Sequence, residues 1–579
     1  MAETADQIHL RRGEADMGSV KRSAKITRRE FVKGMTVGGA GLAAAGMLAG
    51  CAQGPTPTPC PTPVGIPEKW DKEADVVVLG FGGAGAVTAV TVVEAGAKVI
   101  VLEKAPHTGG GASSISGGFI TVTDPDKVED AATYLYTACF GLTPKEVCRA
   151  WAEEIAKTPD WLTQHGIEFM KLTGPFGGAD FKNFPGASAL WSIDIVPPGE
   201  QVMNKGGRVF MEWAAEYLKG KGVEFLFGTP AKELIQHPET KEIIGVWAES
   251  GGNRIAVKAK KAVVLCTGGF EANEEMIGNF IRPAPIKCVG WPFNTGDGIK
   301  MAQKVGADIW HTNILAAAGL TFVPPNSVLG YWGMGFPGPS YIWVTRYGKR
   351  FTCENPSWTM HRAFMGFDIW NWKEDQTDPR YLAIPFYLIF DEKMRQAGPI
   401  YGPATVGPTT IPEGLGGLEP WSQDNTKEIE KGWIKKANTI AELAAAIGEP
   451  TLDPAVLEET IKRYNEYCAN GEDPEFGRPK ELAGMGAAQP SPNLVPLDTP
   501  PYYAMQMWPA VYSTCGGPRK NEKAQVLDPM GNPIPRLYEA GVIGHSAAHV
   551  YSTFGQNWAE IMAFGRIAGR NAAAEKPWS

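Results

Sequence analysis

Apolar and polar positions around residue 75 follow the order of a strand, a turn, a helix and a second strand. The run Asp75–Leu79 (DVVVL) is apolar after its first residue, which is typical of a buried parallel strand. The turn Gly80–Gly85 (GFGGAG) leads into a small, apolar helix expected over residues 86–95. A second apolar run, Lys98–Leu102, ends at Glu103. The pattern therefore predicts a βαβ unit of a parallel sheet.

The glycines of this turn have the GxGxxG spacing of a dinucleotide-binding site. Gly80 permits a tight turn, Gly82 lets the backbone approach a pyrophosphate, and Gly85 lets the helix close on the strand. The N-terminus of the helix would face the phosphate charge. Glu103 follows Gly85 by eighteen residues, where a carboxylate can accept hydrogen bonds from ribose hydroxyls. Strand, turn, helix and acid together indicate an adenine dinucleotide.

The segment Thr108–Gly118 (TGGGASSISGG) favours a flavin over NAD, because it is too rich in glycine for an ordinary loop and its hydroxyls can cap backbone or phosphate oxygens. Farther along, the strand expected over Ala262–Phe270 ends in glycines, and Asp297 stands at the start of the helix expected over 299–305. The expected cofactor contacts are Gly80, Gly82, Gly83, Ala84, Gly85, Glu103, Lys104, Gly111, Ser113, Gly118, Ala231, Gly268, Asp297, Gly541, Asn557, Trp558 and Ala559.

Two segments near the C-terminus complete the expected cofactor site. Arg536–Gly541 (RLYEAG) is a strand that runs into glycine, and Gly555–Glu560 (GQNWAE) opens a helix that continues towards Gly569. A helix N-terminus at this point could stabilise the negative charge that a reduced flavin carries at N1 and O2. The cofactor domain is therefore expected to be assembled from both ends of the chain.

Composition limits the remaining function classes. The 579 residues suffice for two or three domains, and 44% hydrophobic and 20% charged residues are typical of globular enzymes. A formal net charge of -8 argues against nucleic acid, and no run from Asp71 onward is apolar enough to span a bilayer. None of the nine cysteines forms a CxxC or CxxCH motif, so no metal ligand set is expected and electrons must come from an external partner.

Residues 1–50 are predicted to be an export signal. A basic region precedes Thr27–Lys33 (TRREFVK), which has the twin-arginine pattern, and a small, weakly apolar run follows. Leu48–Cys51 (LAGC) resembles a lipobox whose cysteine could be diacylated; the alternative is an ordinary cleavage site with an incidental cysteine. The proline-rich residues 51–71 would form a stiff, extended tether. The expected location is the outer face of the cytoplasmic membrane or the cell envelope.

From Asp75 to Ala574 the chain resembles the flavoproteins that include soluble fumarate reductase, the succinate dehydrogenase flavoprotein and 3-ketosteroid dehydrogenases. The resemblance rests on the strand, GxGxxG turn and helix, and on the motifs GGGASSISGG, LCTGGF, NTGDGIKMA, GKRF, LYEAG and FGRIAGRNAA. It implies an α/β fold in which a discontinuous, Rossmann-like FAD-binding domain, residues 72–310 and 496–579, carries an inserted α+β capping domain, residues 311–495.

The resemblance also implies that the cofactor is FAD and that it is not covalently bound. In succinate dehydrogenases a histidine before the glycine-serine loop carries the flavin, and the corresponding position here is Gly111. His107 lies four residues earlier and is interpreted as a loop histidine.

The charged groups with which fumarate reductases bind and protonate a dicarboxylate are missing at the matching positions. The proton-donor arginine falls at Trp358, the histidine pair at Tyr512–Ser513 and the clamp arginine at Thr553. A dicarboxylate would leave buried charges unpaired, at a cost of several kcal/mol for each. The alternative is a fumarate- or acrylate-type reductase with a rearranged site, in which Arg362 or Arg519 supplies charge from a new position.

Tyr551 and Gly555 instead match the Y-x-x-x-G of 3-ketosteroid dehydrogenases, whose tyrosine hydroxyl and glycine N–H bind the substrate carbonyl oxygen. By this resemblance the pair would stabilise enolate charge. The alternative is a structural tyrosine satisfied by the backbone. The aromatic-rich stretch Phe322–Trp372 would line a flat apolar pocket, with Tyr331 or Tyr341 as the proton donor or acceptor.

These features predict an exported FAD-dependent oxidoreductase that reduces, or forms, a C=C bond conjugated to a carbonyl in a hydrophobic ring substrate such as a 3-ketosteroid or a phenolic enone. Hydride transfer at flavin N5 and proton transfer from a tyrosine would carry out the reduction. The electron donor would be a cytochrome- or quinol-linked partner. A non-catalytic electron-relay flavoprotein is the alternative of another class, and the large aromatic cap argues against it because a relay has no need of one.

Overall fold

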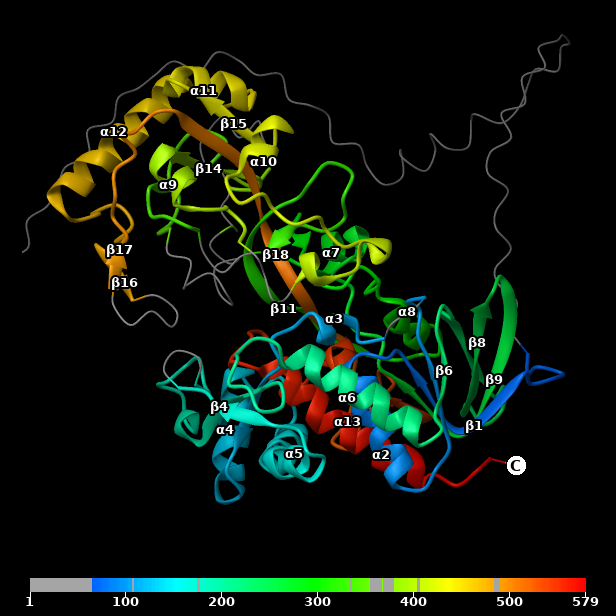
Figure 1. Cartoon of the computed structure of the whole chain (residues 1–579). Helices are drawn as coiled ribbons and strands as arrows, with labels where there is room; N and C mark the ends of the chain where they lie inside the picture. The colour runs from blue at the N-terminus through cyan, green and yellow to red at the C-terminus, as the bar shows by residue number, and fades with distance from the viewer. Residues whose placement is uncertain are drawn as a thin grey trace, which may run out of the picture. The chain divides into compact units, whose positions relative to one another are not determined.

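Figure 1 shows the architecture of the chain in a computed structural model. The structure describes residues 65–106, 109–173, 177–332, 336–354, 367, 380–402, 407–483 and 490–578. All of them belong to a unit that spans Val64–Ser579. The export signal, Cys51 and most of the tether lie outside the described residues, as do His107, Trp358 and Arg362.

The first layer is an eight-stranded sheet with parallel central strands. β1 (Lys72–Leu79) lies between β2 (Val99–Leu102) and β9 (Asn253–Leu265), and β20 (Pro533–Glu539) pairs with the other edge of β9. Both ends of the described chain therefore contribute to one sheet. The apolar run of β1 is buried on both faces, as parallel strands require. The outer strands are β6 (Glu224–Leu226), β7 (Ala231–Gln236), β8 (Ile243–Ser250) and β19 (Gln525–Leu527).

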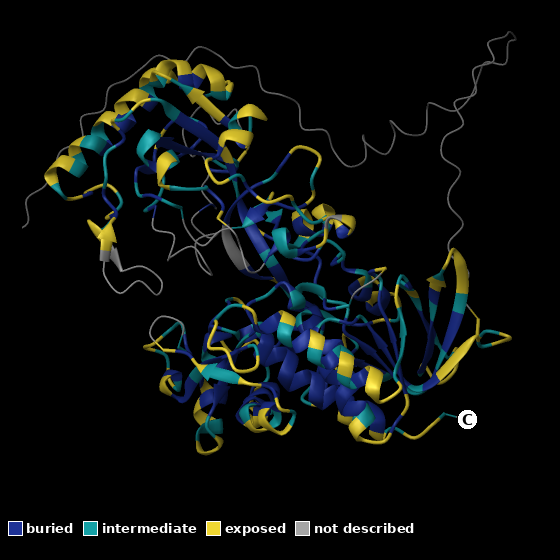
Figure 2. Ribbon diagram, in the orientation of Figure 1, coloured by how far each residue is buried: buried dark blue, intermediate teal, exposed yellow. Residues whose placement is uncertain are grey.

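Helices α2 (Gly83–Glu94) and α13 (Gln556–Ala574) pack against each other beside this sheet, and Figure 2 shows both buried along most of their length. Glycine permits the close approach, since a Cβ at Gly565 would lie 2.9 Å from the Cβ of Val87. The helices around them are α4 (Val128–Ala138), α5 (Lys145–Gln164) and α6 (Gly206–Gly220). A three-stranded sheet is formed by β3 (Phe119–Thr123), β4 (Phe169–Lys171) and β5 (Leu190–Ile195).

The second sheet is seven-stranded and largely antiparallel. Its longest strands, β11 (Ile309–Phe322) and β18 (Tyr502–Pro518), pair with each other. β14 (Phe386–Asp391) pairs antiparallel with the first residues of β18. Residue 495 is the expected end of the capping domain, but this sheet also contains β18, which lies beyond that residue and pairs with β11 as far as Pro518. The other strands are β10 (Lys287–Cys288), β12 (Tyr331–Trp332), β13 (Tyr341–Val344) and β15 (Ile434–Ala437).

The second sheet carries its own helices, whose outer faces are exposed in Figure 2: α9 (Glu392–Ala397), α10 (Thr426–Glu430), α11 (Ile440–Ile447) and α12 (Pro454–Asn470). The remaining short helices are α3 (Gly111–Ser114), α7 (Glu274–Phe280) and α8 (Asp297–Lys304). A separate two-stranded sheet is formed by β16 (Glu481–Ala483) and β17 (Pro490–Pro492). A parallel sheet with helices plus an antiparallel-sheet domain confirms the predicted α/β architecture. In the described chain, no helix combines the length and hydropathy needed to cross a bilayer.

Candidate active site

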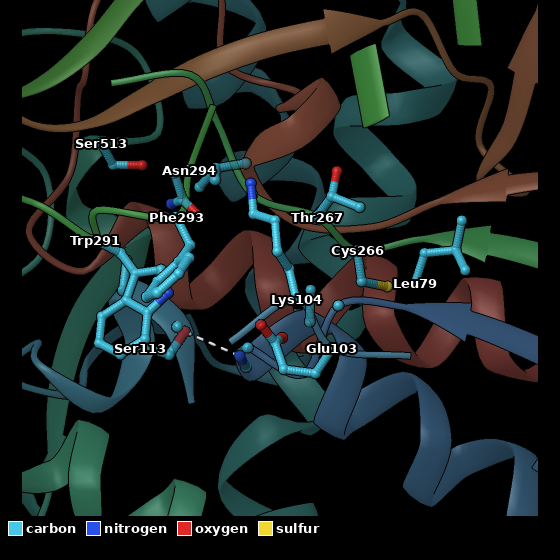
Figure 3. A pocket seen from close by; sticks show the side chains of 18 of the residues that line it. Leu79, Glu103, Lys104, Ser113, Cys266, Thr267, Trp291, Phe293, Asn294 and Ser513 are labelled. Carbon is cyan, nitrogen blue, oxygen red and sulfur yellow. Dashed lines mark hydrogen bonds between the residues drawn. The ribbon is translucent and has the colours of Figure 1, made fainter. Parts of the chain in front are cut away.

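A cavity opens where the parallel strands of the first sheet end (Figure 3). Together with the solvent space at its mouth it measures about 1090 Å³. Its wall includes residues that end or directly follow β1, β2, β9 and β20, namely Leu79, Leu102, Cys266 and Ala540. Open α/β sheets bind ligands at this place, outside the carboxyl ends of their strands. The fold therefore positions the cavity as a ligand site.

Most of the expected cofactor contacts line this cavity. They are Gly80, Gly82, Gly83, Ala84, Glu103, Lys104, Gly111, Ser113, Ala231, Gly268, Asp297, Asn557 and Trp558. Gly80 makes the turn after β1, with φ of 97°, and a Cβ there would be 2.5 Å from the carbonyl oxygen of Cys266. At Gly82 the nearest atoms would be 3.9 Å from a Cβ, so the missing side chain leaves room for a ligand beside the backbone.

Four expected contacts lie behind the cavity wall instead. A Cβ at Gly85 would meet the carbonyl oxygen of Gly80 at 2.0 Å, so this glycine lets α2 close on β1. A Cβ at Gly118 would meet the backbone of Gly206 at 2.4 Å. Gly541 has φ of 86° in the turn after β20, and Ala559 is fully buried in α13. These positions shape the wall without facing the cavity.

Glu103 is fixed by the backbone around it. One carboxylate oxygen accepts the N–H of Phe81 at 2.7 Å, and the other accepts the N–H of Ala105 at 2.7 Å. The side chain is 7% exposed, and burial raises its pKa above the ordinary value. Each oxygen keeps a second lone pair, which can accept a ribose hydroxyl.

Two contacts that were predicted separately meet at the cavity wall. Lys104 Nζ lies 2.6 Å from Asp297 Oδ2 and donates to Thr295 Oγ1 at 2.7 Å. The pair joins the end of β2 to the start of α8. A third contact holds the glycine turn Gly80–Gly85 against α3, since the N–H of Gly83 donates to Ser113 Oγ at 3.0 Å (Figure 3).

A β-bulge brings Tyr512 into the cavity wall beside Ser513. Along β18, Ser513 pairs with Ala316 and Val511 pairs with Ala317, so Tyr512 has no partner on β11. Strict alternation would turn the two side chains to opposite faces, whereas a bulge re-aims one of them. Both residues line the cavity, and the Tyr512 hydroxyl donates to the carbonyl oxygen of Ile115 at 2.8 Å. Burial raises the pKa of Tyr512, so the phenol stays protonated.

Sequence reasoning did not identify Tyr512 as a candidate catalytic residue. The available signal was its position, since Tyr512–Ser513 stands where fumarate reductases have a histidine pair. Trp291 and Phe293, which line the same side of the pocket as Ser513 in Figure 3, had no sequence signal, because they lie on a loop without a recognisable motif.

Tyr551 lies against the first turn of α13. Its phenol oxygen accepts the N–H of Asn557, a cavity residue, at 3.1 Å, and its side chain is 8% exposed. Burial raises the Tyr551 pKa. Gly555 caps the helix with φ of 100°, and a Cβ there would lie 2.7 Å from the backbone of Phe119. Tyr551 and Gly555 thus both stand at the positive end of α13, although neither lines the cavity itself.

The structure places the two expected proton donors away from the cavity. The Tyr331 hydroxyl donates to the carbonyl oxygen of Glu419 at 2.9 Å, and its ring packs on Tyr401. The Tyr341 hydroxyl donates to the carbonyl oxygen of Glu354 at 3.0 Å. Both rings belong to the apolar core of the second sheet, and neither lines the cavity. Their positions therefore do not support the expected proton transfer from Tyr331 or Tyr341.

Among the described cavity residues, Lys104 is the only basic side chain, and it is paired with Asp297. Thr553, at the expected clamp position, is buried and accepts a hydrogen bond from Thr121 at 2.8 Å. Arg519 is 37% exposed and pairs with Asp308 outside the cavity. The described part of the site therefore offers a dicarboxylate no arginine or histidine.

A discontinuous parallel-sheet domain, a glycine turn and a buried acid at this cavity define a dinucleotide-binding protein, and sequence comparison gives the family. The chain belongs to the family described as FAD binding domain, which matches residues 75–557. This confirms the predicted family and its cofactor, FAD. By this membership the protein is an FAD-dependent oxidoreductase that acts on CH–CH groups.

Its relatives include digoxin reductase of Eggerthella lenta, which is 28% identical over 95% of this chain and 97% of the relative. The 3-oxosteroid 1-dehydrogenase of Mycolicibacterium smegmatis is 26% identical over 87% of this chain and 98% of the relative. Among solved structures, 3-ketosteroid Δ1-dehydrogenase from Sterolibacterium denitrificans, in complex with 1,4-androstadiene-3,17-dione, aligns with a TM-score of 0.69 at 21% identity, covering 87% of this chain and all of that chain. The last comparison shows that the fold is shared.

Proposed function

We propose that this protein reduces a C=C bond conjugated to a carbonyl group in a hydrophobic ring compound of the 3-ketosteroid or phenolic enone class. The observation that carries the proposal is the cavity wall formed by Trp291, Phe293, Tyr512 and Ser513, which is aromatic and hydroxylic and carries no formal charge. A neutral ring would bury apolar surface there, whereas each carboxylate of fumarate would be buried without a counter-charge.

When bound, FAD supplies the hydride that reaches the β-carbon of the substrate. The chain must then stabilise negative charge on the carbonyl oxygen. Tyr551 and the N–H of Gly555 would hold this oxygen, because both stand at the N-terminus of α13, directly behind the cavity wall, and the Tyr551 hydroxyl is hydrogen-bonded to the cavity residue Asn557. The positive end of the helix dipole favours an enolate at this point, and donors that are fixed before the reaction do not have to reorganise.

Tyr512 would donate the proton to the α-carbon. It is the tyrosine that lines the cavity in the described chain, and it holds its proton because burial opposes the phenolate. Its hydrogen bond to the carbonyl of Ile115 fixes the orientation of the ring and would break as the proton moves. This assignment replaces Tyr331 and Tyr341, which lie in the apolar core of the second sheet and do not line the cavity.

The test is reoxidation of the flavin by candidate substrates. The holoenzyme is photoreduced without oxygen and mixed with a 3-ketosteroid enone, a phenolic enone, acrylate or fumarate, while flavin absorbance is followed. We expect rapid reoxidation by at least one ring enone and background rates with acrylate and fumarate. Fumarate turnover equal to that of the best enone would refute the proposed substrate class. Reoxidation by none of the compounds, together with rapid exchange with a redox protein, would instead support an electron relay.

We also propose that the protein works at the outer face of the cytoplasmic membrane or in the cell envelope, held by a lipid on Cys51. The support is the sequence of residues 27–33 and 48–51, which has the twin-arginine and lipobox patterns. Its electron donor would be a cytochrome- or quinol-linked partner, since no cysteine motif of the chain could hold an iron–sulfur cluster or attach haem.

A further inference from the structure

A cluster of fully buried charged groups lies behind the flavin cavity. Lys520 Nζ is 2.8 Å from Glu539 Oε1 and 2.6 Å from Glu560 Oε1, and none of the three side chains has any exposed surface. The ammonium also donates to the carbonyl oxygen of Gly544 at 2.6 Å. Buried charges lose their hydration and are retained only where partners compensate. The protonation states of Lys520, Glu539 and Glu560 therefore decide whether the cluster carries a buried net charge.

Both carboxylates belong to elements that also wall the cavity. Glu539 is the last residue of β20, and its neighbour Ala540 lines the cavity. Glu560 lies one helical turn after Asn557, another cavity residue, on α13. The charge of Glu539 also contributes to raising the pKa of Cys266, a residue of the cavity wall whose thiol is mainly shifted by burial. A change of charge in the cavity reaches Glu539 through buried protein, which screens it far less than water does.

The two carboxylates are not equally satisfied. Glu560 accepts the N–H of Ser546 at 3.1 Å and its hydroxyl at 2.8 Å, in addition to its contact with Lys520. Although burial opposes it, the charge of Lys520 lowers the pKa of Glu560. Glu539 Oε2, in contrast, has no hydrogen-bond partner among the described residues. Burial raises the pKa of Glu539 to about 8.

Histidines near the cluster do not supply the missing positive charge. His545 Nδ1 lies 3.9 Å from Glu560 Oε2, and burial lowers the pKa of His545 to about 4. His311 Nδ1 lies 3.0 Å from the carbonyl oxygen of His545, and burial also lowers its pKa to about 4. One ammonium therefore faces two carboxyl groups, and the cluster is neutral only when one of them holds a proton.

We propose that Glu539 is a redox-linked proton site, which takes up one proton from solvent when the bound flavin is reduced. Reduction by an external donor places two electrons and one proton on the flavin and leaves one negative charge. The N-terminus of α13 would stabilise that charge, and the charge would disfavour a second negative charge on Glu539. Linkage is reciprocal, so a proton on Glu539 in turn makes reduction more favourable.

The pH range of the effect follows from the ionisation of Glu539. Well below pH 8, Glu539 is protonated in both redox states and reduction consumes one proton. Above pH 8, the ionised form of Glu539 predominates in the oxidised protein, whereas the negative charge on the flavin would keep Glu539 protonated in the reduced protein. Reduction then consumes two protons for each pair of electrons, which steepens the pH dependence of the flavin midpoint potential by about 30 mV per pH unit.

The experiment measures the midpoint potential of bound FAD from pH 6 to pH 10 by dithionite titration. We compare the wild-type holoenzyme, Glu539→Gln and the control Glu428→Gln, a buried carboxylate of α10 that accepts the N–H of Ser422 at 3.0 Å and does not line the cavity. The steeper slope above pH 8 is expected in wild type and in the control, and not in Glu539→Gln.

A pH indicator gives a second measurement on wild-type protein alone, which decides the matter if Glu539→Gln fails to retain FAD. Two protons per FAD at pH 8.5 to 9 support the proposal, and one proton per FAD overturns it. Equal slopes in wild type and a loaded Glu539→Gln variant also overturn it. No organic substrate takes part, so the result is independent of the proposed enone reaction.

Discussion

Tyr551 and Asn557 are joined by a hydrogen bond of 3.1 Å, in which the phenol oxygen accepts the backbone N–H of the helix. Because Asn557 lines the cavity, this contact fixes the tyrosine at the point where the positive end of α13 meets the cofactor site. A tyrosine in this position could stabilise enolate charge or only hold the loop before Gly555. The two roles have different consequences when the hydroxyl is removed.

Tyr551→Phe is expected to lower kcat by about 10² to 10³, or about 3 to 4 kcal/mol of barrier, because one donor to the enolate is lost while the ring remains. FAD content should not change. A purely structural tyrosine would instead cost about 1 to 3 kcal/mol of stability and leave turnover per bound FAD normal. Single-turnover reoxidation and melting temperature are measured on the same preparation. Tyr341→Phe, which removes a hydroxyl from the core of the second domain, is the matched control and should reoxidise normally.

Tyr512→Phe should abolish proton delivery and lower the rate of substrate-dependent reoxidation by about 10² to 10⁴. The photoreduction step should be unaffected, since it needs no proton from this phenol. Tyr503→Phe removes a hydroxyl from the same strand outside the cavity, where it donates to Glu392 at 2.6 Å, and serves as the control. A fully loaded Tyr512→Phe variant with normal reoxidation would show that the proton comes from another group.

FAD should be released completely by acid precipitation. The reason is Gly111, which lines the cavity at the position where succinate dehydrogenases have the flavin-linked histidine and which offers no side-chain nucleophile. Absorbance of the supernatant and the pellet is compared after trichloroacetic acid treatment. A yellow pellet that resists washing would contradict the prediction.

Stability should fall in acid through Glu154, which ties α5 to α13. Glu154 is 4% exposed and lies 2.9 Å from Arg566 and 2.7 Å from Arg570. Burial opposes ionisation, but the two guanidinium groups lower the pKa of Glu154 to about 2 from 4.5. A folded-state pKa below the unfolded value stabilises the protein above pH 4.5, and this contribution of about 3 kcal/mol is lost as pH falls towards 2.

Glu154→Gln should therefore be destabilised by about 3 to 5 kcal/mol at pH 7, because Arg566 is left buried without its partner, and should lose less stability between pH 5 and pH 3 than wild type does. Melting temperature across this pH range is the measurement. Glu153→Gln, on the exposed side of the same helix, should behave like wild type. Parallel pH profiles in all three proteins would remove Glu154 as a cause of acid sensitivity.

Cys51→Ser should release active protein from membranes, because a serine cannot receive the diacyl lipid expected at the lipobox. FAD content and reoxidation rate should stay as in wild type, since the flavoprotein body begins beyond the tether. Membrane and soluble fractions are compared by immunoblot. Unchanged partitioning would leave the cleavage-site interpretation of residues 48–51.

Much of the cavity wall could be predicted from the sequence because its constraints are local. Gly80 has a positive φ, a Cβ at Gly85 would clash with the carbonyl oxygen of Gly80, and Glu103 directly follows the second strand. The spacing of these three residues in the sequence therefore follows from the local geometry. The same reasoning located the start of α8 near Asp297. What the sequence did not show is that Lys104 and Asp297 form one ion pair, because 193 residues separate them.

The proposed proton donor, Tyr512, could not be predicted from the sequence, because aromatic composition does not distinguish a core from a pocket. Tyr331 and Tyr341 lie in an aromatic-rich stretch, yet both rings belong to the apolar core of the second sheet and lie outside the cavity. Tyr512 reaches the cavity through an irregularity in strand pairing that depends on β11, a strand about two hundred residues away. Such an irregularity leaves no periodic signal in the sequence.

β18 carries both the centre of the second sheet and part of the cavity wall on one uninterrupted strand. Its first residues pair with β14 and β15, and Tyr512 and Ser513 follow within the same strand. A single inserted or deleted residue between Tyr502 and Tyr512 would rotate every later side chain to the opposite face. The length of β18 thus fixes the spacing between the second sheet and the cavity wall. Exchanged side chains along β18 or in the loops beside it can therefore change the cavity lining without shifting the second sheet.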